Sequence, residues 1–242
     1  METKANQLLE ATKELSDNVS RLSFSSPVAV VYNPLRYAWD SHRMYIDRYG
    51  ASKKRVVFLG MNPGPWGMAQ TGVPFGEIQA VRDWLDISAP IQKPEIEHPK
   101  RRVEGFSCSR SEVSGRRLWG LFKERFGSAD DFFAGHFVAN YCPLVFMEEG
   151  GKNRTPDKLR KEERVPLFEL CDLHLKRIME ILEAEWLVGI GGFAAKSAER
   201  IFPASSFQIG QILHPSPASP AANRDWAGKV TEQMKSLGIW DA

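Results

Sequence analysis

Four short apolar segments, separated by long stretches of helical periodicity, constrain the fold of this chain more than any other feature. Each is rich in branched or aromatic residues and ends at turn-forming residues, which is typical of a buried strand. They are residues 56–59, 137–139, 186–190 and 207–213. Helices are expected at residues 164–185 and 114–126. This alternation predicts an α/β fold: a three-layer α/β/α sandwich with a central, mainly parallel four-stranded sheet.

Length and periodicity favour one domain over residues 1–242. The chain is 43% hydrophobic and 26% charged, which is enough apolar content for a sizeable core. An amphipathic N-terminal helix is expected at about residues 3–22, where Leu8, Leu15 and Val19 lie close to one helical face. The proline-rich and charged stretches at residues 89–102 and 148–160 are interpreted as loops within the domain.

Charge and cysteine content limit the possible functions. The net charge of +2 does not identify a nucleic-acid binder. The three cysteines lie far apart, so we expect reduced thiols, no metal and no other cofactor, and a four-cysteine iron–sulfur cluster would need one more thiolate. The N-terminus lacks the apolar stretch of a signal peptide, and the longest apolar run, residues 186–195, is too short to span a membrane. We therefore expect a soluble, cytoplasmic monomer with no membrane contact.

Polar residues follow three of the four predicted strands, where open α/β sheets bind ligands. Asn62 follows the first strand, Asn140 the second and His214 the last. The loop at residues 60–76 is rich in glycine and proline, and three prolines follow His214, so both loops are stiff. Each loop alone is also typical of a plain connection, and an isolated histidine more often bonds a backbone carbonyl than acts in catalysis.

A basic segment provides a candidate phosphate-binding surface. Its members lie within eighteen residues: Lys100, Arg101, Arg102, Arg110, Arg116 and Arg117. Ser114 and Gly115 lie at the start of a predicted helix, whose free N–H groups could add a phosphate site. A solvated face and an ordinary helix cap are the alternatives.

The loop sequences together resemble the motifs of the single-strand-selective monofunctional uracil-DNA glycosylases. These are GMNPGPWGMAQTGVPFGE at 60–77, RSEVSG at 110–115, NYCPL at 140–144, GKNRTP at 151–156 and HPSP at 214–217, followed by Asn223. The resemblance implies the uracil-DNA glycosylase fold and a role in base-excision repair. The implied reaction is hydrolysis of the N-glycosidic bond of uracil, and of 5-hydroxymethyluracil or other deaminated or oxidised bases, in single- and double-stranded DNA. The product is an abasic site.

The resemblance also implies a role for each matching position. Asn62 would orient the attacking water and His214 would stabilise the leaving base. The base would be bound by Met61, Gly64, Met68, Phe75 and Asn140. Phe75 would stack on the base and Asn140 would read its edge, while the other three would shape the side near its 5-position. DNA would be contacted by Ser114, Gly115, Arg116, Pro215, Ser216, Pro217, Ala218 and Arg224.

One position departs from the family pattern. Some relatives carry an arginine wedge in the proline-rich loop where this chain has Ala218, and Arg224 lies farther along. Since extruding a base from a duplex costs a few kcal/mol, we expect weaker stabilisation of the flipped base in paired DNA.

Two other functions stay open at this stage. A non-catalytic lesion- or nucleotide-binding module would keep the pocket without turnover. A metal-dependent nuclease or nucleoside hydrolase is less well supported, because the motif loops contain no clustered Asp, Glu and His ligands. A DNA-repair enzyme would lie with the nucleoid in a bacterial cell or in the nucleus of a eukaryotic one.

Overall fold

The centre of the molecule is a parallel four-stranded sheet in the order β3-β2-β6-β7. The computed structural model describes residues 2–204 and 206–241, so Met1, Ser205 and Ala242 of the expected domain lie outside the described residues. The strands are β2 (Val56–Gly60), β3 (His136–Asn140), β6 (Trp186–Ile190) and β7 (Gln208–Ile212). Each coincides with a predicted segment to within one residue at either end, which confirms the α/β fold and its parallel sheet.

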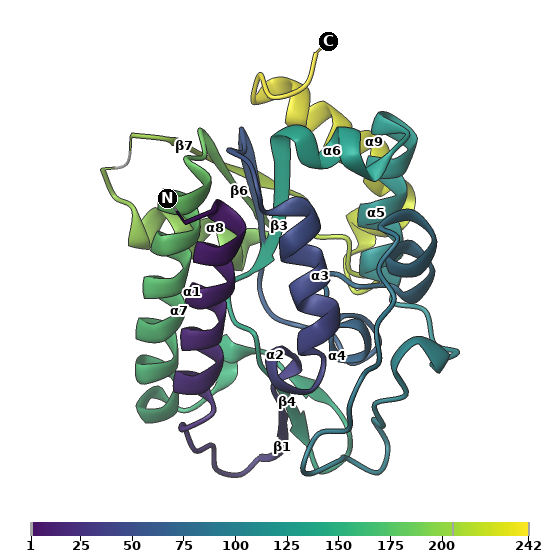
Figure 1. Ribbon diagram of the computed structural model, residues 1–242, viewed down its shortest axis with the longest axis vertical. Helices are drawn as coiled ribbons and strands as arrows, with labels where there is room; N and C mark the ends of the chain where they lie inside the picture. The colour runs from purple at the N-terminus through teal and green to yellow at the C-terminus, as the bar shows by residue number, and fades with distance from the viewer. Residues whose placement is uncertain (1, 205, 242) are drawn as a thin grey trace.

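Helices cover both faces of this sheet (Figure 1), so that Val56, Val57, Phe58 and Leu59 of β2 are fully buried. On one side lie α1 (Lys4–Val19), α7 (Lys161–Leu182) and α8 (Gly192–Ile201), and α3 (Trp39–Tyr49) packs beside α1. On the other side lie α5 (Val113–Phe126), α6 (Ala129–Gly135) and α9 (Pro220–Ser236). The helices expected at residues 164–185 and 114–126 correspond to α7 and α5.

A second, antiparallel sheet lies beyond the carboxyl ends of the parallel strands, at the bottom of Figure 1. Its order is β1-β4-β5, with β1 (Val28–Tyr32), β4 (Val145–Glu148) and β5 (Asn153–Arg154). The prediction of a loop at residues 148–160 is therefore wrong at Glu148, in β5 and in the short 3-10 turn η3 (Pro156–Lys158). Gly151, with φ of +84°, reverses the chain between β4 and β5, and two residues are too few to show an alternating pattern.

The remaining elements are short and lie in the connections. They are α2 (Pro34–Tyr37), α4 (Met68–Thr71), the π-helical turn η1 (Ala80–Trp84) and the 3-10 turn η2 (Gly105–Ser107). Residues 89–102 contain no regular helix or strand, as predicted. None of the helices formed by the described residues is both long enough and apolar enough to cross a membrane.

Candidate active site

A pocket of about 360 Å³ lies at the carboxyl ends of the parallel strands. It brings together Asn62 after β2, Asn140 at the end of β3 and His214 after β7. Its full lining is Met61, Asn62, Pro63, Gly64, Phe75, Glu112, Ser114, Asn140, Asn153, Thr155, His214 and Ser216. Both predicted catalytic residues and four of the five predicted base-binding residues therefore face one space.

Met68 is the base-binding prediction that the structure places elsewhere. Its side chain is 2% exposed and lies outside the pocket lining, in contact with Asn140. The Asn140 Nδ2 donates to the Met68 Sδ at 3.3 Å. Met68 therefore contacts the amide of Asn140 without lining the pocket itself.

Glycine at the end of β2 lets the side chains of Asn140 and Phe75 approach the sheet. A Cβ at Gly60 would collide with the Asn140 Oδ1 and would lie 2.6 Å from the Phe75 ring. Phe75 itself has φ of 51°, and its carbonyl accepts from the Trp119 indole N–H at 2.9 Å and from the Glu77 N–H at 2.7 Å. The ring and the amide are thus both held against the strand backbone by buried groups.

Asn62 is oriented by a hydrogen bond to the backbone just before β4. Its Nδ2 donates to the carbonyl of Leu144 at 3.2 Å. The Oδ1 is left as the group that can accept from a ligand or a water molecule. The loop beside it is braced by Asn153, whose Nδ2 donates to the Pro63 carbonyl at 3.3 Å.

The hydrogen bonds of His214 fix which of its nitrogens carries the proton. The Ser216 N–H donates to the His214 Nδ1 at 3.0 Å, so in the neutral ring the proton lies on Nε2. Burial lowers the pKa of His214 from its usual 6.5, so the imidazole is neutral at physiological pH. The His214 side chain packs against Gly191, where a Cβ would lie 2.9 Å from the His214 Cβ. His214 therefore presents a neutral N–H donor.

Comparison with known proteins identifies the family of this fold and pocket. A model of the Uracil DNA glycosylase superfamily matches residues 47–235. The chain belongs to this superfamily. It is 45% identical over 237 residues to the single-strand selective monofunctional uracil DNA glycosylase of Bos taurus, covering 97% of this chain and 87% of that protein. The Rattus norvegicus protein of the same name is 46% identical over the same length, covering 97% of this chain and 85% of the relative.

A solved structure has the same fold at a much lower sequence identity. The crystal structure of wild-type Pedobacter heparinus SMUG2 matches with a TM-score of 0.72 at 19% identity, over 99% of this chain and all of that one. At this identity the match concerns the fold alone. It agrees with the parallel sheet and its covering helices.

Residues 215–218, which include the position expected to carry a wedge, form an arch after His214 whose tip is exposed. Pro217 and Ala218 are exposed, whereas Pro215 is buried. Arg117 on α5 donates to the Pro215 carbonyl and to the Asn223 Oδ1, both at 3.0 Å, and the Asn223 Nδ2 donates to the Pro217 carbonyl at 2.8 Å. The arch is therefore held by side chains from α5 and α9.

The other predicted DNA contacts lie at the start of α5 and on α9. Ser114 lines the pocket and Gly115 is buried beside it, while Arg116 and Arg224 are exposed. The Arg116 Nη1 donates to the Ser111 hydroxyl at 3.0 Å.

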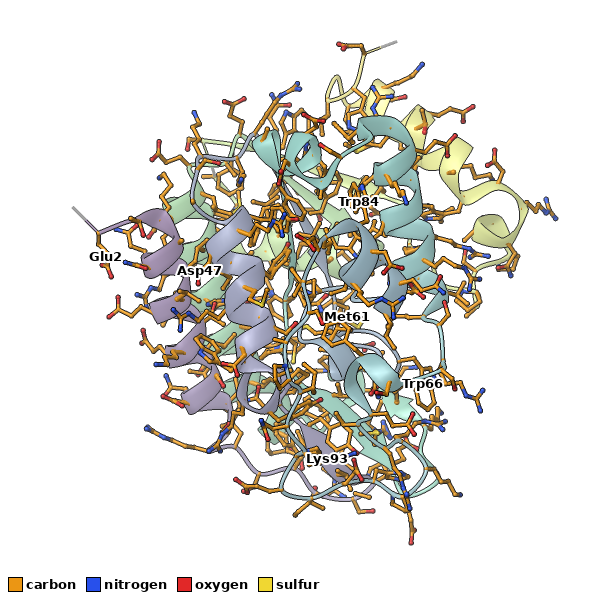
Figure 2. The ribbon with its side chains drawn as sticks, turned by 45° about the vertical axis from the view of Figure 1, so that its right-hand side comes forward. Glu2, Asp47, Met61, Trp66, Trp84 and Lys93 are labelled. Carbon is orange, nitrogen blue, oxygen red and sulfur yellow. The ribbon has the colours of Figure 1, made fainter. Side chains whose placement is uncertain are left out.

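Two predicted basic residues converge on an aromatic ring beside the pocket. The guanidinium groups of Arg101 and Arg110 lie over Trp66 at 5.3 and 5.6 Å from the ring centroid. Neither arginine forms an ion pair within the part of the chain that the structure describes. Figure 2 shows Met61 near the middle of the molecule and Trp66, from the same loop, near its edge. This loop thus joins the pocket to a positively charged surface.

Sequence reasoning missed two pocket-lining residues that carry buried, unpartnered oxygens. The Glu112 Oε2 and the Asn153 Oδ1 have no hydrogen-bond partner among the described residues. Burial and the neighbouring carboxylate of Glu77 raise the pKa of Glu112 to about 7. Both residues lie in segments that match the family motifs, RSEVSG and GKNRTP. The neighbouring sequence does not indicate that Glu112 and Asn153 face the pocket.

Proposed function

We propose that this protein is a monofunctional uracil-DNA glycosylase that hydrolyses the N-glycosidic bond of uracil in DNA and leaves an abasic site. One observation carries the proposal: three separate parts of the chain line one pocket, namely the loop after β2 with Asn62 and Phe75, the end of β3 with Asn140, and the loop after β7 with His214. Membership of the superfamily and the names of the mammalian relatives support it. The repair role places the protein with the nucleoid in a bacterium or in the nucleus of a eukaryote.

Recognition of uracil is assigned to Phe75 and Asn140. The Phe75 ring stacks on the base, and the Asn140 amide accepts from the uracil N3–H and donates to O4. Cytosine presents an unprotonated N3 and an amino group instead, so the same amide orientation opposes it. The packing of both side chains on Gly60 supports a fixed orientation.

Bond cleavage is assigned to His214 and Asn62. Breaking the bond develops negative charge on uracil and positive charge on the sugar. The neutral His214 Nε2–H donates to the developing oxyanion, an interaction of a kind worth roughly 3–4 kcal/mol. A neutral amide is a poor base. Asn62 therefore positions the attacking water through its Oδ1 and does not act as the main acceptor of the water's proton. No lysine takes part, and the DNA strand stays intact.

The proposed scope of the activity rests on the residues that line one side of the pocket. Met61 and Gly64 line the side assigned to the 5-position of the base, which supports 5-hydroxymethyluracil and other oxidised or deaminated bases as further substrates. DNA in single- and double-stranded form is the partner, and the protein acts as a monomer without metal or cofactor. Arg101 and Arg110 lie over Trp66 and form no ion pair among the described residues. Their free positive charge supports a phosphate-binding surface at this place.

Release of free uracil separates this proposal from a non-catalytic lesion-binding module. The purified protein is incubated with a single-stranded oligonucleotide that carries one uracil, and the free base is quantified. We expect stoichiometric release of uracil, with strand breakage only after added alkali. Tight binding without release would favour the binding module, and a nick without alkali would contradict monofunctional action.

A further inference from the structure

Glu112 is a carboxyl group in a pocket that has to hold an anion. Of the residues that line the pocket, Glu112 and His214 are the two with acid or base side chains. Glu112 immediately precedes α5, and a Cβ at Gly64 or Gly67 would collide with its carboxyl oxygens. The glycines of the loop after β2 therefore leave room for this carboxyl, and its Oε2 is buried without a hydrogen-bond partner among the described residues.

Among the described residues, no Lys, Arg or His side chain forms an ion pair with Glu112. On the loop after β2, residues 60–71 contain no charged side chain. On the following segment Glu77 is itself acidic, and its two carboxyl oxygens accept from the Ser111 hydroxyl and the Ala80 N–H, both at 2.9 Å. On α5, the Arg116 guanidinium donates to Ser111 and forms no ion pair with Glu112. Across the pocket, His214 is neutral.

Both steps of the proposed function oppose a negative charge at this place. The leaving uracil becomes an anion in the same pocket, and the expected DNA contacts Ser114 and Gly115 lie in the first turn of α5, close to Glu112 in sequence. Like charges at such short range cost free energy, and the low dielectric of a closed pocket increases that cost. A protonated carboxyl carries no such cost.

Resting on the proposed function, we infer that Glu112 is a positioning residue that must be protonated when uracil-containing DNA occupies the pocket, so DNA binding takes up a proton from solvent at this carboxyl. The ionised form of Glu112 is the inactive form. This couples glycosylase activity to pH through a group that does not itself touch the reacting bond.

The direction of the pH effect follows from the environment of the group. Burial and Glu77 raise the pKa of Glu112 to about 7, and the Gly115 N–H acts in the opposite direction. Below this pKa the group is neutral, and above it the group is ionised in the free protein. His214 titrates on the acid side, since burial lowers its pKa. The fall of activity on the alkaline side is therefore due to Glu112 and is separate from His214.

The first test is the pH dependence of kcat/KM for uracil release from a single-stranded oligonucleotide, which reports ionisations of the free enzyme. Between about pH 6.5 and about pH 8.5 we expect kcat/KM of the unmodified protein to fall by about tenfold or more. Glu112→Gln mimics the protonated acid and should change by less than about twofold over the same range. Glu124→Gln, the same change at an exposed position of α5, should keep the full fall.

A second variant changes the surroundings of Glu112 and leaves Glu112 itself in place. Glu77→Gln removes the neighbouring negative charge, so the pKa of Glu112 should fall and the alkaline limb should move to lower pH. A limb that persists unchanged in Glu112→Gln, or a flat profile in the unmodified protein, overturns the inference. If the unmodified protein releases no uracil at any pH, the proposed function has failed instead.

Proton uptake can be measured without turnover. The protein binds a single-stranded oligonucleotide that carries 2′-fluoro-2′-deoxyuridine, and the heat of binding is compared in buffers of different ionisation enthalpy. At about pH 8 we expect uptake of close to one proton by the unmodified protein and by Glu124→Gln, and none by Glu112→Gln. A purely structural role of Glu112 would not change this count. Equal uptake by Glu112→Gln and the unmodified protein overturns the inference.

Discussion

Two loops carry the side chains to which catalysis is assigned, and the two loops are held rigid in different ways. The β2 loop (residues 61–79) carries Asn62, and its backbone is bonded to the core: the Cys142 N–H donates to the Met61 carbonyl and the Trp119 indole donates to the Phe75 carbonyl, both at 2.9 Å. The β7 loop (residues 213–219) carries His214 and contains prolines, and its tip is exposed.

This difference between the two loops predicts how far the structural effect of a substitution extends. In the β2 loop, glycines permit close packing, so an added atom displaces several site residues at once. In the β7 loop, the shape is set by proline and by the side chains of Arg117 and Asn223, so a change at its tip stays local. Substitutions of similar size should therefore disturb folding and function in the first loop and function alone in the second.

The largest effect is expected at Gly60, the last residue of β2, directly before the β2 loop. Gly60→Ala would push against both Asn140 and the Phe75 ring. We expect kcat/KM for uracil release to fall on the order of 10³, because stacking and edge recognition are lost together, each worth about 1–3 kcal/mol. The free energy of unfolding should fall by about 1–3 kcal/mol in a denaturant titration.

Gly120→Ala is the matched control for this substitution. Gly120 lies on α5, and a Cβ there would have no heavy atom within 4 Å. We expect unchanged activity and a gain in unfolding free energy of about 0.5–1 kcal/mol, since alanine favours the helix. A Gly60→Ala protein with near-normal activity would refute the close-packing explanation.

In the β7 loop we expect a large loss of activity with little change in the free energy of unfolding. His214→Ala removes the donor to the leaving base, so kcat should fall by about 10²–10³. The unfolding free energy should change by no more than about 1 kcal/mol, because the ring contributes one hydrogen bond with Ser216. Single-turnover rates and a denaturant titration measure both quantities. A stability loss as large as that of Gly60→Ala would remove the contrast between the loops.

Asn62 separates water positioning from proton removal within the β2 loop. Asn62→Ala should lower kcat by about 10², because the water loses its oriented acceptor. Asn62→Asp keeps an acceptor oxygen and should retain activity within about tenfold. Both are compared in single-turnover release of uracil. An Asn62→Ala protein near the normal rate would exclude Asn62 from the mechanism.

The parts of the fold that were predictable from sequence are those set by local pattern. The strands β2, β3, β6 and β7 are short apolar runs that end at turn formers, and a parallel sheet buried on both faces produces this pattern. The sheet formed by β1, β4 and β5 was not predicted. Its third strand is two residues long and exists through pairing with β4, which is not visible in the local sequence.

The site was predictable to the extent that strand ends define it. Asn62, Asn140 and His214 follow predicted strands, and parallel topology alone brings them to one edge. Glu112 precedes a helix, and its place in the pocket depends on the shape of Gly64 and Gly67 in a distant loop. Met68 lies within the motif, but its side chain contacts Asn140 and does not line the pocket. Such packing is non-local, so sequence pattern does not specify it.

The smallest expected effect concerns the exposed tip of the β7 loop. Ala218→Arg adds a long side chain where Ala218 is exposed. It should raise kcat/KM on double-stranded uracil DNA by about threefold to tenfold, by filling the gap left by the extruded base, and by less than about twofold on single strands. Ala218→Leu supplies bulk without charge, so a gain shared by both variants identifies a wedge, whereas a gain confined to arginine and lost at high salt identifies phosphate attraction. If Ala218→Arg also altered activity on single strands by tenfold, the change would have reached His214, and the β7 loop would not be the independent element that its proline frame predicts.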